Sequence, residues 1–229
     1  MEWARGPIFR GALAFMVLGL ARHVVLNVLA ICRAWRRAGD KRIPYLAVAQ
    51  ATVQWLVPFK KIKNRLTYSL TTLAFHAAIL IVPVFLAGHI ALWRRAVGLS
   101  WWAIPNRLAD VLTVVAVATA IALVIERAAA RDTRSLSRFG DYVIPLLVAL
   151  PFASGLCLMH PTINPFPFDV MMFVHVMSGN LILILIPLTK LSHVAMLPIT
   201  QLVSELAWHF PPTAGSEVAV ALGKENEPV

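Results

Sequence analysis

Long apolar runs separated by short polar stretches organise this sequence of 229 residues. A helix needs about 20 mostly apolar residues to cross a bilayer. Five segments meet that requirement and are predicted to span a membrane: residues 8–32, 66–93, 108–125, 142–160 and 170–198. The pattern therefore predicts an all-α integral membrane protein, a bundle of five transmembrane helices over residues 1–198 followed by a tail at 199–229.

A sixth apolar run, "PYLAVAQATVQWLVPF" at 44–59, is shorter and is bounded by Pro44 and Pro58. At 1.5 Å per residue its roughly 15 residues reach about 22 Å, less than the ~30 Å hydrocarbon core. We interpret it as an interfacial helix, with a sixth span as the less favoured alternative.

Composition agrees with a membrane protein, because 59% of the residues are hydrophobic and only 14% are charged. The net charge of +10 often indicates nucleic acid, but the basic residues lie in short loops between apolar runs, so no nucleic-acid partner is expected. The two cysteines form no CxxC or CxxCH motif, which disfavours covalent haem, iron–sulfur clusters and structural zinc within this chain. No motif of an independent catalytic domain stands out.

Loop charge predicts the orientation. The loop at 33–65 holds nine Lys or Arg, the loop at 126–141 holds four, and the loop at 160–169 holds none. The positive-inside rule places the first two loops in the cytoplasm. The N-terminus is then outside and the C-terminal tail is cytoplasmic.

Four of the seven histidines lie on the two cleanest predicted spans, His76 and His89 on 66–93 and His175 and His193 on 170–198. The two spans run in opposite directions, so His76 and His193 form an inner pair and His89 and His175 an outer pair. Two facing imidazoles are the axial ligands of a six-coordinate b-type haem. The alternative is that each histidine only hydrogen-bonds a neighbouring helix.

Helical phase distinguishes the two spans. His175 and His193 are 18 residues apart, about five whole turns, so one helix would present both on one face. His76 and His89 are 13 residues apart, about 220° after whole turns, so an ideal helix would point them to different sides. Pro83 lies between them and can kink the helix.

The run "FVHVMSGNLILILIPLTKLSHVAMLP" at 173–198, with "PLTKLSH" at its inner end, resembles the fifth helix of the gamma subunit of respiratory nitrate reductase. It is also similar to the membrane cytochromes of heterodisulfide-reductase-like and sulfite-reductase-associated complexes. The run "FHAAILIVPVFLAGH" at 75–89 resembles the second helix of that family, which bears two histidines and a Gly before the outer one. The resemblance covers residues 66–198. One departure is the 13-residue spacing of His76 and His89, longer than expected for the nitrate reductase branch.

The resemblance implies a dihaem cytochrome b in a bacterial or archaeal cell (inner) membrane, the quinone-reactive subunit of a multi-subunit oxidoreductase. Two b haems would take His76, His193, His89 and His175 as axial ligands. Electrons would pass between quinone and an iron–sulfur or molybdenum partner at the cytoplasmic face. Quinone would bind beside the outer haem, near Gly88.

Several side chains are candidates to contact these groups. A basic residue is expected beside the quinone, or else simply at lipid headgroups, and Lys190 could reach a haem propionate. The candidates near the quinone are Arg94, Arg95 and Arg107. Arg22 could pair with a propionate or with Asp110, and His160 is a spare candidate ligand for the outer haem.

Two other functions stay open. One is a membrane anchor with a single haem at the inner pair. The other, less favoured because no internal repeat is evident, is a haem-free transporter with histidines along a polar path.

Overall fold

The computed structural model describes residues 2–37, 45–56, 66–196, 199 and 213–224. The chain divides into two compact units. The first unit comprises residues 1–16 and 59–185, and the second comprises residues 17–58 and 186–229.

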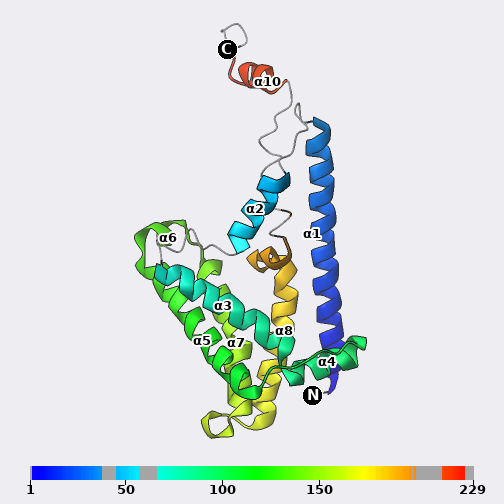
Figure 1. Cartoon of the computed structure of the whole chain (residues 1–229), viewed down its shortest axis with the longest axis vertical. Coiled ribbons are helices and arrows are strands. Elements are labelled where there is room, and N and C mark those ends of the chain that lie inside the picture. The colour runs from blue at the N-terminus through cyan, green and yellow to red at the C-terminus, as the bar shows by residue number, and fades with distance from the viewer. Residues whose placement is uncertain (1, 38–44, 57–65, 197–198, 200–212, 225–229) are drawn as a thin grey trace. The chain divides into compact units, whose positions relative to one another are not determined.

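The described residues are mostly helical and contain no strand. Figure 1 labels the main helices in chain order. The elements are η1 (Ala4–Ile8), α1 (Phe9–Arg37), α2 (Tyr45–Leu56), α3 (Leu66–Phe85), α4 (Ala87–Val97), α5 (Asn106–Ala129), α6 (Arg131–Leu136), α7 (Phe139–Met159), η3 (Pro161–Ile163), α8 (Phe168–Leu188), η4 (Lys190–Ser192) and α10 (Ala214–Ala221).

Five helices among the described residues are long and apolar enough to cross a membrane, which confirms the predicted number. They are Ala4–Arg37, Leu66–Phe85, Asn106–Ala129, Phe139–Met159 and Phe168–Leu188. The short run at 44–59 contains a helix, α2, of 12 residues. Its length of about 18 Å is too short to span the hydrocarbon core.

The second span is shorter than predicted, because the helix expected over 66–93 is broken. Leu86 adopts an extended conformation (φ −74°, ψ 130°) between α3 and α4. Pro83 lies three residues before the break and has no N–H to donate within α3. His76 and His89 therefore lie on different helices, and the phase calculated for one continuous helix was wrong.

The fifth span also ends early. The helix predicted over 170–198 stops at Leu188, one residue after Pro187. Thr189 is extended, and its hydroxyl accepts a hydrogen bond from the N–H of Leu191 (3.2 Å), which starts the short helix η4. The prediction that one helix carries His175 and His193 on one face was therefore wrong.

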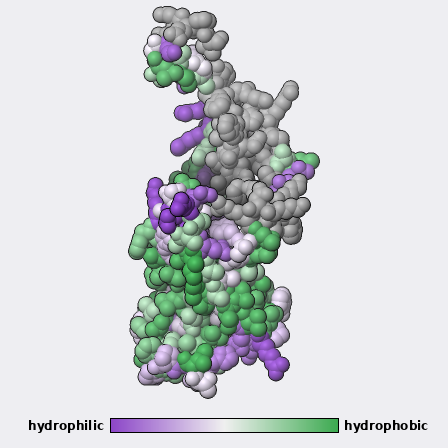
Figure 2. All heavy atoms as spheres, turned by 90° about the vertical axis from the view of Figure 1, so that its left-hand side faces the viewer, coloured by the Kyte–Doolittle hydropathy of each residue, from purple (hydrophilic) through white to green (hydrophobic). Residues whose placement is uncertain are grey.

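In the first unit, α5 packs against both α3 and α7 (Figure 1). Its buried face consists of small residues, Ala109, Thr113, Ala116 and Ala120. Small residues let membrane helices approach closely. The opposite face exposes large apolar side chains suited to lipid: Val111, Val114, Ile121 and Ile125. Figure 2 shows a broad hydrophobic surface (green) on this side of the first unit.

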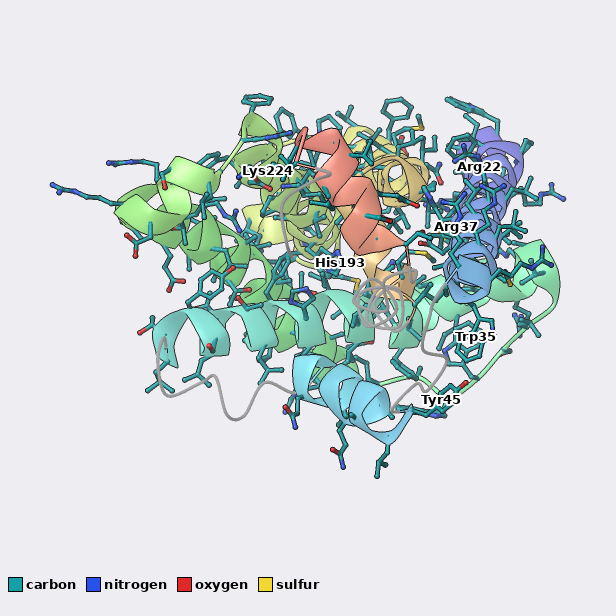
Figure 3. All side chains as sticks on the ribbon, turned by 90° about the horizontal axis from the view of Figure 1, so that it is seen from above. Arg22, Trp35, Arg37, Tyr45, His193 and Lys224 are labelled. Carbon is teal, nitrogen blue, oxygen red and sulfur yellow. The ribbon has the colours of Figure 1, made fainter. Side chains whose placement is uncertain are left out.

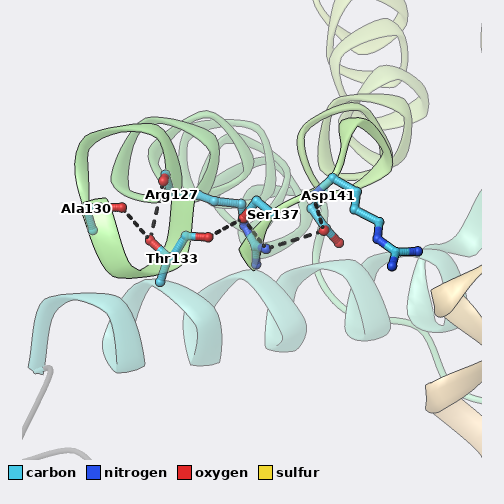
Figure 4. A network of polar contacts seen from close by, with 6 residues as sticks. Arg127, Ala130, Thr133, Ser137 and Asp141 are labelled. Carbon is cyan, nitrogen blue, oxygen red and sulfur yellow. Dashed lines mark hydrogen bonds and ion pairs between the residues drawn. The ribbon is translucent and has the colours of Figure 1, made fainter. Parts of the chain in front are cut away.

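A polar network joins the ends of α5 and α7 through α6 (Figure 4). The carboxylate of Asp141 accepts a hydrogen bond from the backbone N–H of Arg138 (2.9 Å) and lies 4.0 Å from the guanidinium of Arg127. Arg127 also donates to the hydroxyl of Ser137 (3.3 Å). Charged and polar groups thus gather at one end of these helices, as expected of a loop in water.

In the second unit, α1 lies against the end of α8. The ring Nε2 of His23 donates to the carbonyl oxygen of Pro187 (2.7 Å). A Cβ atom added at Gly19 would lie 2.5 Å from Cβ of Pro187, so only glycine fits at this contact. The hydrogen bond gives the membrane histidine of α1 a structural role. Figure 3 labels Arg22 and Arg37 on the same helix.

Candidate metal centre

The break between α3 and α4 positions His89. The carbonyl of Leu86 accepts hydrogen bonds from the N–H groups of His89 (2.9 Å) and Ile90 (3.0 Å), which begins α4. His89 therefore lies in the first turn of a new helix, and its direction is independent of the helical phase of α3.

The break is stabilised by the segment that follows α4. Carbonyl oxygens at the end of α3 lose their helical partners and need others, above all in a membrane. The indole N–H of Trp101 donates to the carbonyl of Val84 (2.8 Å), and the N–H of Ile104 donates to that of Phe85 (3.0 Å).

His89 and His175 face each other within the first unit. Their ring centroids are 5.9 Å apart, and the ring planes are 10° from parallel. The predicted outer pair is therefore adjacent in the fold, on α4 and α8.

The proton of His175 can be placed. Its Nδ1 lies 2.8 Å from the carbonyl oxygen of Pro151 on α7. A carbonyl only accepts, so Nδ1 carries the proton and Nε2 of the neutral ring keeps its lone pair. The hydroxyl of Ser154 lies 3.4 Å from the same Nδ1. Metal-binding histidines commonly have this arrangement, with one ring nitrogen donating to a carbonyl and the other bound to the metal.

His89 contributes a polar atom without a protein partner. Its Nδ1 is buried and accepts or donates no hydrogen bond among the described residues. A buried polar atom in this state is costly unless another group binds it. The ring therefore has a nitrogen to offer to a ligand.

The centroid separation matches that of two imidazoles on one metal, and the nearly parallel planes are also those of offset stacked rings. A metal–imidazole bond is about 2 Å long, and each ring centre is about 1 Å further away, which gives a centroid separation of about 6 Å. A bare ion needs about four protein ligands. Within the part of the chain that the structure describes, no group of three or more His, Cys, Asp or Glu could hold one.

The inner histidines show the same backbone arrangement. Nδ1 of His76 lies 2.8 Å from the carbonyl of Thr72, and Nδ1 of His193 lies 2.6 Å from the carbonyl of Lys190. In each ring Nδ1 is thus the protonated nitrogen. His76 belongs to the first unit and His193 to the second, so their pairing stays a prediction.

The residues predicted near the quinone surround His89 in sequence. Gly88 precedes it on α4, and a Cβ added there would meet nothing within 4 Å. Arg94 and Arg95 are exposed in the last turn of α4, and Arg107 is exposed in the first turn of α5. The structure provides no contact that joins these arginines to the histidine pair.

The other candidates lie elsewhere. His160 ends α7, and its Nε2 is 3.3 Å from the carboxylate of Asp110, so Asp110 has a partner other than the predicted Arg22.

Sequence reasoning missed the residues of α7 that contact His175. Pro151 and Ser154 lie in the run "PFASG" of the fourth span. Small and polar residues in a membrane helix indicate close approach of another helix, which is the signal that could have found them.

The fold and the apolar helices define this chain as a multi-pass α-helical membrane protein. It is 31% identical over 199 residues to a protein of Nitratidesulfovibrio vulgaris (strain Hildenborough) that is named simply "Protein". The aligned region covers 83% of this chain and 85% of the relative. The chain belongs to the same family as that protein. No protein-family model and no solved structure matches the chain.

Proposed function

We propose that this protein is a dihaem b-type cytochrome, the membrane subunit of an oxidoreductase that exchanges electrons between quinone and a partner redox subunit. Haem, when bound, supplies the one-electron chemistry that the side chains of this chain lack. The protein itself supplies the axial ligands, their orientation and the surrounding apolar environment.

The observation that carries the proposal is the His89–His175 pair. The two rings lie at a separation suited to a shared metal, and each has a nitrogen without a protein hydrogen bond among those described. A structural histidine in a membrane helix normally satisfies a neighbour, as His23 does with Pro187. His175 also donates to a carbonyl, that of Pro151, so the feature that sets the pair apart is the buried Nδ1 of His89, which has no hydrogen-bond partner among the described residues.

His76 and His193 are proposed as the ligands of the second, inner haem. Each ring is oriented by a carbonyl on its own helix or turn, that of Thr72 or of Lys190. This arrangement supports Nε2 as the ligand atom in both. The side chain of Lys190 is proposed to pair with a propionate of the inner haem.

Quinone is proposed to bind beside α4. Gly88 leaves open space next to His89, and the basic side chains of Arg94, Arg95 or Arg107 can hydrogen-bond a quinone carbonyl or bind a lipid headgroup. These groups would hold quinone at the outer side of the membrane, near the outer haem.

The partner is proposed to dock at the opposite face. Arg127, Arg131, Arg134 and Arg138 gather around α6, where the positive-inside rule predicts the cytoplasm. This orientation puts the N-terminus outside. An iron–sulfur or molybdenum subunit would exchange electrons there with the inner haem, in a bacterial or archaeal cell (inner) membrane.

A reduced-minus-oxidised spectrum with a pyridine haemochrome assay of the purified protein tests the proposal. We expect the α-band of b-type haem and about two haems per chain. One haem would instead support a single-haem anchor. No haem in folded protein would overturn the proposal and favour a transporter.

A further inference from the structure

The helix α7 approaches the ring of His175 at a glycine. A Cβ atom added at Gly155 would lie 3.0 Å from Cε1 and 3.2 Å from Nδ1 of His175. Both distances are shorter than ordinary van der Waals contact, so a side chain at this position would displace the ring or the helix. Gly140, on the same helix, has no such neighbour, since its Cβ would meet only Cδ1 of Ile144 at 3.9 Å.

Two acceptors lie on the same turn of α7. The carbonyl of Pro151 is 2.8 Å from Nδ1 of His175, and the hydroxyl of Ser154 is 3.4 Å from it. Ser154 is buried and donates its own proton to the carbonyl of Leu150 (2.8 Å). Its oxygen lone pairs therefore remain to accept from the imidazole N–H.

We propose that Pro151, Ser154 and Gly155 form a cradle on α7 that positions His175: Gly155 admits the ring, and the carbonyl of Pro151 and the hydroxyl of Ser154 hold its Nδ1–H. This inference rests on the proposed function only for its effect on haem. The contact between the ring and α7 can be tested without it.

The cradle sets both the direction and the basicity of the ligand. Because Nδ1–H is held against α7, Nε2 points away from that helix. A hydrogen bond from Nδ1–H makes the ring a stronger donor to iron, which favours the oxidised metal. Weakening the bond raises the reduction potential of the outer haem, and moving the ring lowers haem retention.

The first experiment compares Gly155→Ala, Gly155→Val and Ser154→Ala with the control Gly140→Ala in the full chain. Redox titration and electron paramagnetic resonance of the oxidised protein report each haem separately. Gly155→Ala and Ser154→Ala are expected to shift the potential of one haem upward and to change one low-spin signal, with the other haem unchanged. Gly155→Val is expected to lose about one haem per chain. A merely structural role of α7 would affect both haems together or neither.

The second experiment does not depend on haem. Nitrogen-15 NMR of histidine-labelled protein as purified, with the His175 signal assigned from His175→Gln, reports the tautomer and surroundings of that ring. The His175 signal is expected to move in Gly155→Ala and to stay in place in Gly140→Ala. An unmoved signal in Gly155→Ala would overturn the cradle. A moved signal in a protein that carries no haem would support the cradle and overturn only the proposed function.

Discussion

The indole of Trp101 donates a hydrogen bond to the carbonyl of Val84 at 2.8 Å, at the point where α3 breaks. Trp102, the next residue, instead stacks on Phe85 with ring centroids 4.5 Å apart. The loop after α4 thus returns to the end of α3 and stabilises the break that positions His89. One tryptophan does so by a hydrogen bond and the other by ring contact.

Trp101→Phe is expected to lower the free energy of unfolding by about 1 kcal/mol, because the carbonyl of Val84 loses its donor while the aromatic bulk is kept. Thermal unfolding in detergent micelles measures the change. Trp102→Phe is the matched control, since it keeps an aromatic ring on Phe85 and removes no hydrogen bond among the described residues. Equal melting temperatures for the two variants would contradict the role of Trp101.

Gly19→Ala is expected to destabilise the contact between α1 and the end of α8 by about 1–3 kcal/mol, because the added methyl would overlap Pro187. Gly11→Ala on the same helix meets nothing within 4 Å and is the control. The same melting assay measures both. A Gly19 variant as stable as the Gly11 variant would show that this contact does not form.

The number and position of the spans followed from hydropathy, because the hydrocarbon core requires a minimum apolar length. The ends did not. Hydropathy continues smoothly across Leu86 and Thr189, whereas the helices stop there. A proline just before each break was visible, but a proline alone does not tell a kink from a stop. That decision depends on tertiary partners such as Trp101.

The outer pair could be predicted from the sequence only by depth along two antiparallel spans. In a continuous helix over 66–93, His89 would point to a different side from His76, which argued against His89 as a ligand. The break at Leu86 removes that objection, because His89 lies on a separate helix. The contacts of Pro151, Ser154 and Gly155 with His175 could not be predicted, since they depend on how α7 and α8 pack. For the inner pair, His76 and His193 lie in separate units, and the pairing stays a prediction.

Asp141→Ala is expected to lower the free energy of unfolding by about 1 kcal/mol, because the carboxylate caps α7 at the N–H of Arg138. The guanidinium of Arg127 lies 4.0 Å from the carboxylate, at the outer limit of an ion pair, so it is expected to add less than the cap. Asp141→Asn keeps an oxygen that can accept the bond and is expected to lose less. Thermal unfolding of both variants measures the difference. If the asparagine variant lost as much as the alanine variant, the charge would matter more than the cap.

His76→Ala and His193→Ala are each expected to lose the same haem, about one per chain. The double variant is then expected to retain the other haem, because the two ligands serve one site and their effects do not add. Pyridine haemochrome assays count the haem. His160→Ala is the control, since its ring pairs with Asp110. A double variant that lost both haems would rule out a shared inner site.

The central claim is that His89 and His175 bind one haem between them. The most direct test is the haem content of His175→Ala purified beside the wild-type protein, with melting temperature as a check on folding. We predict about one haem per chain in the variant against about two in the wild type, with one low-spin signal lost. A folded variant that kept both haems would contradict the claim.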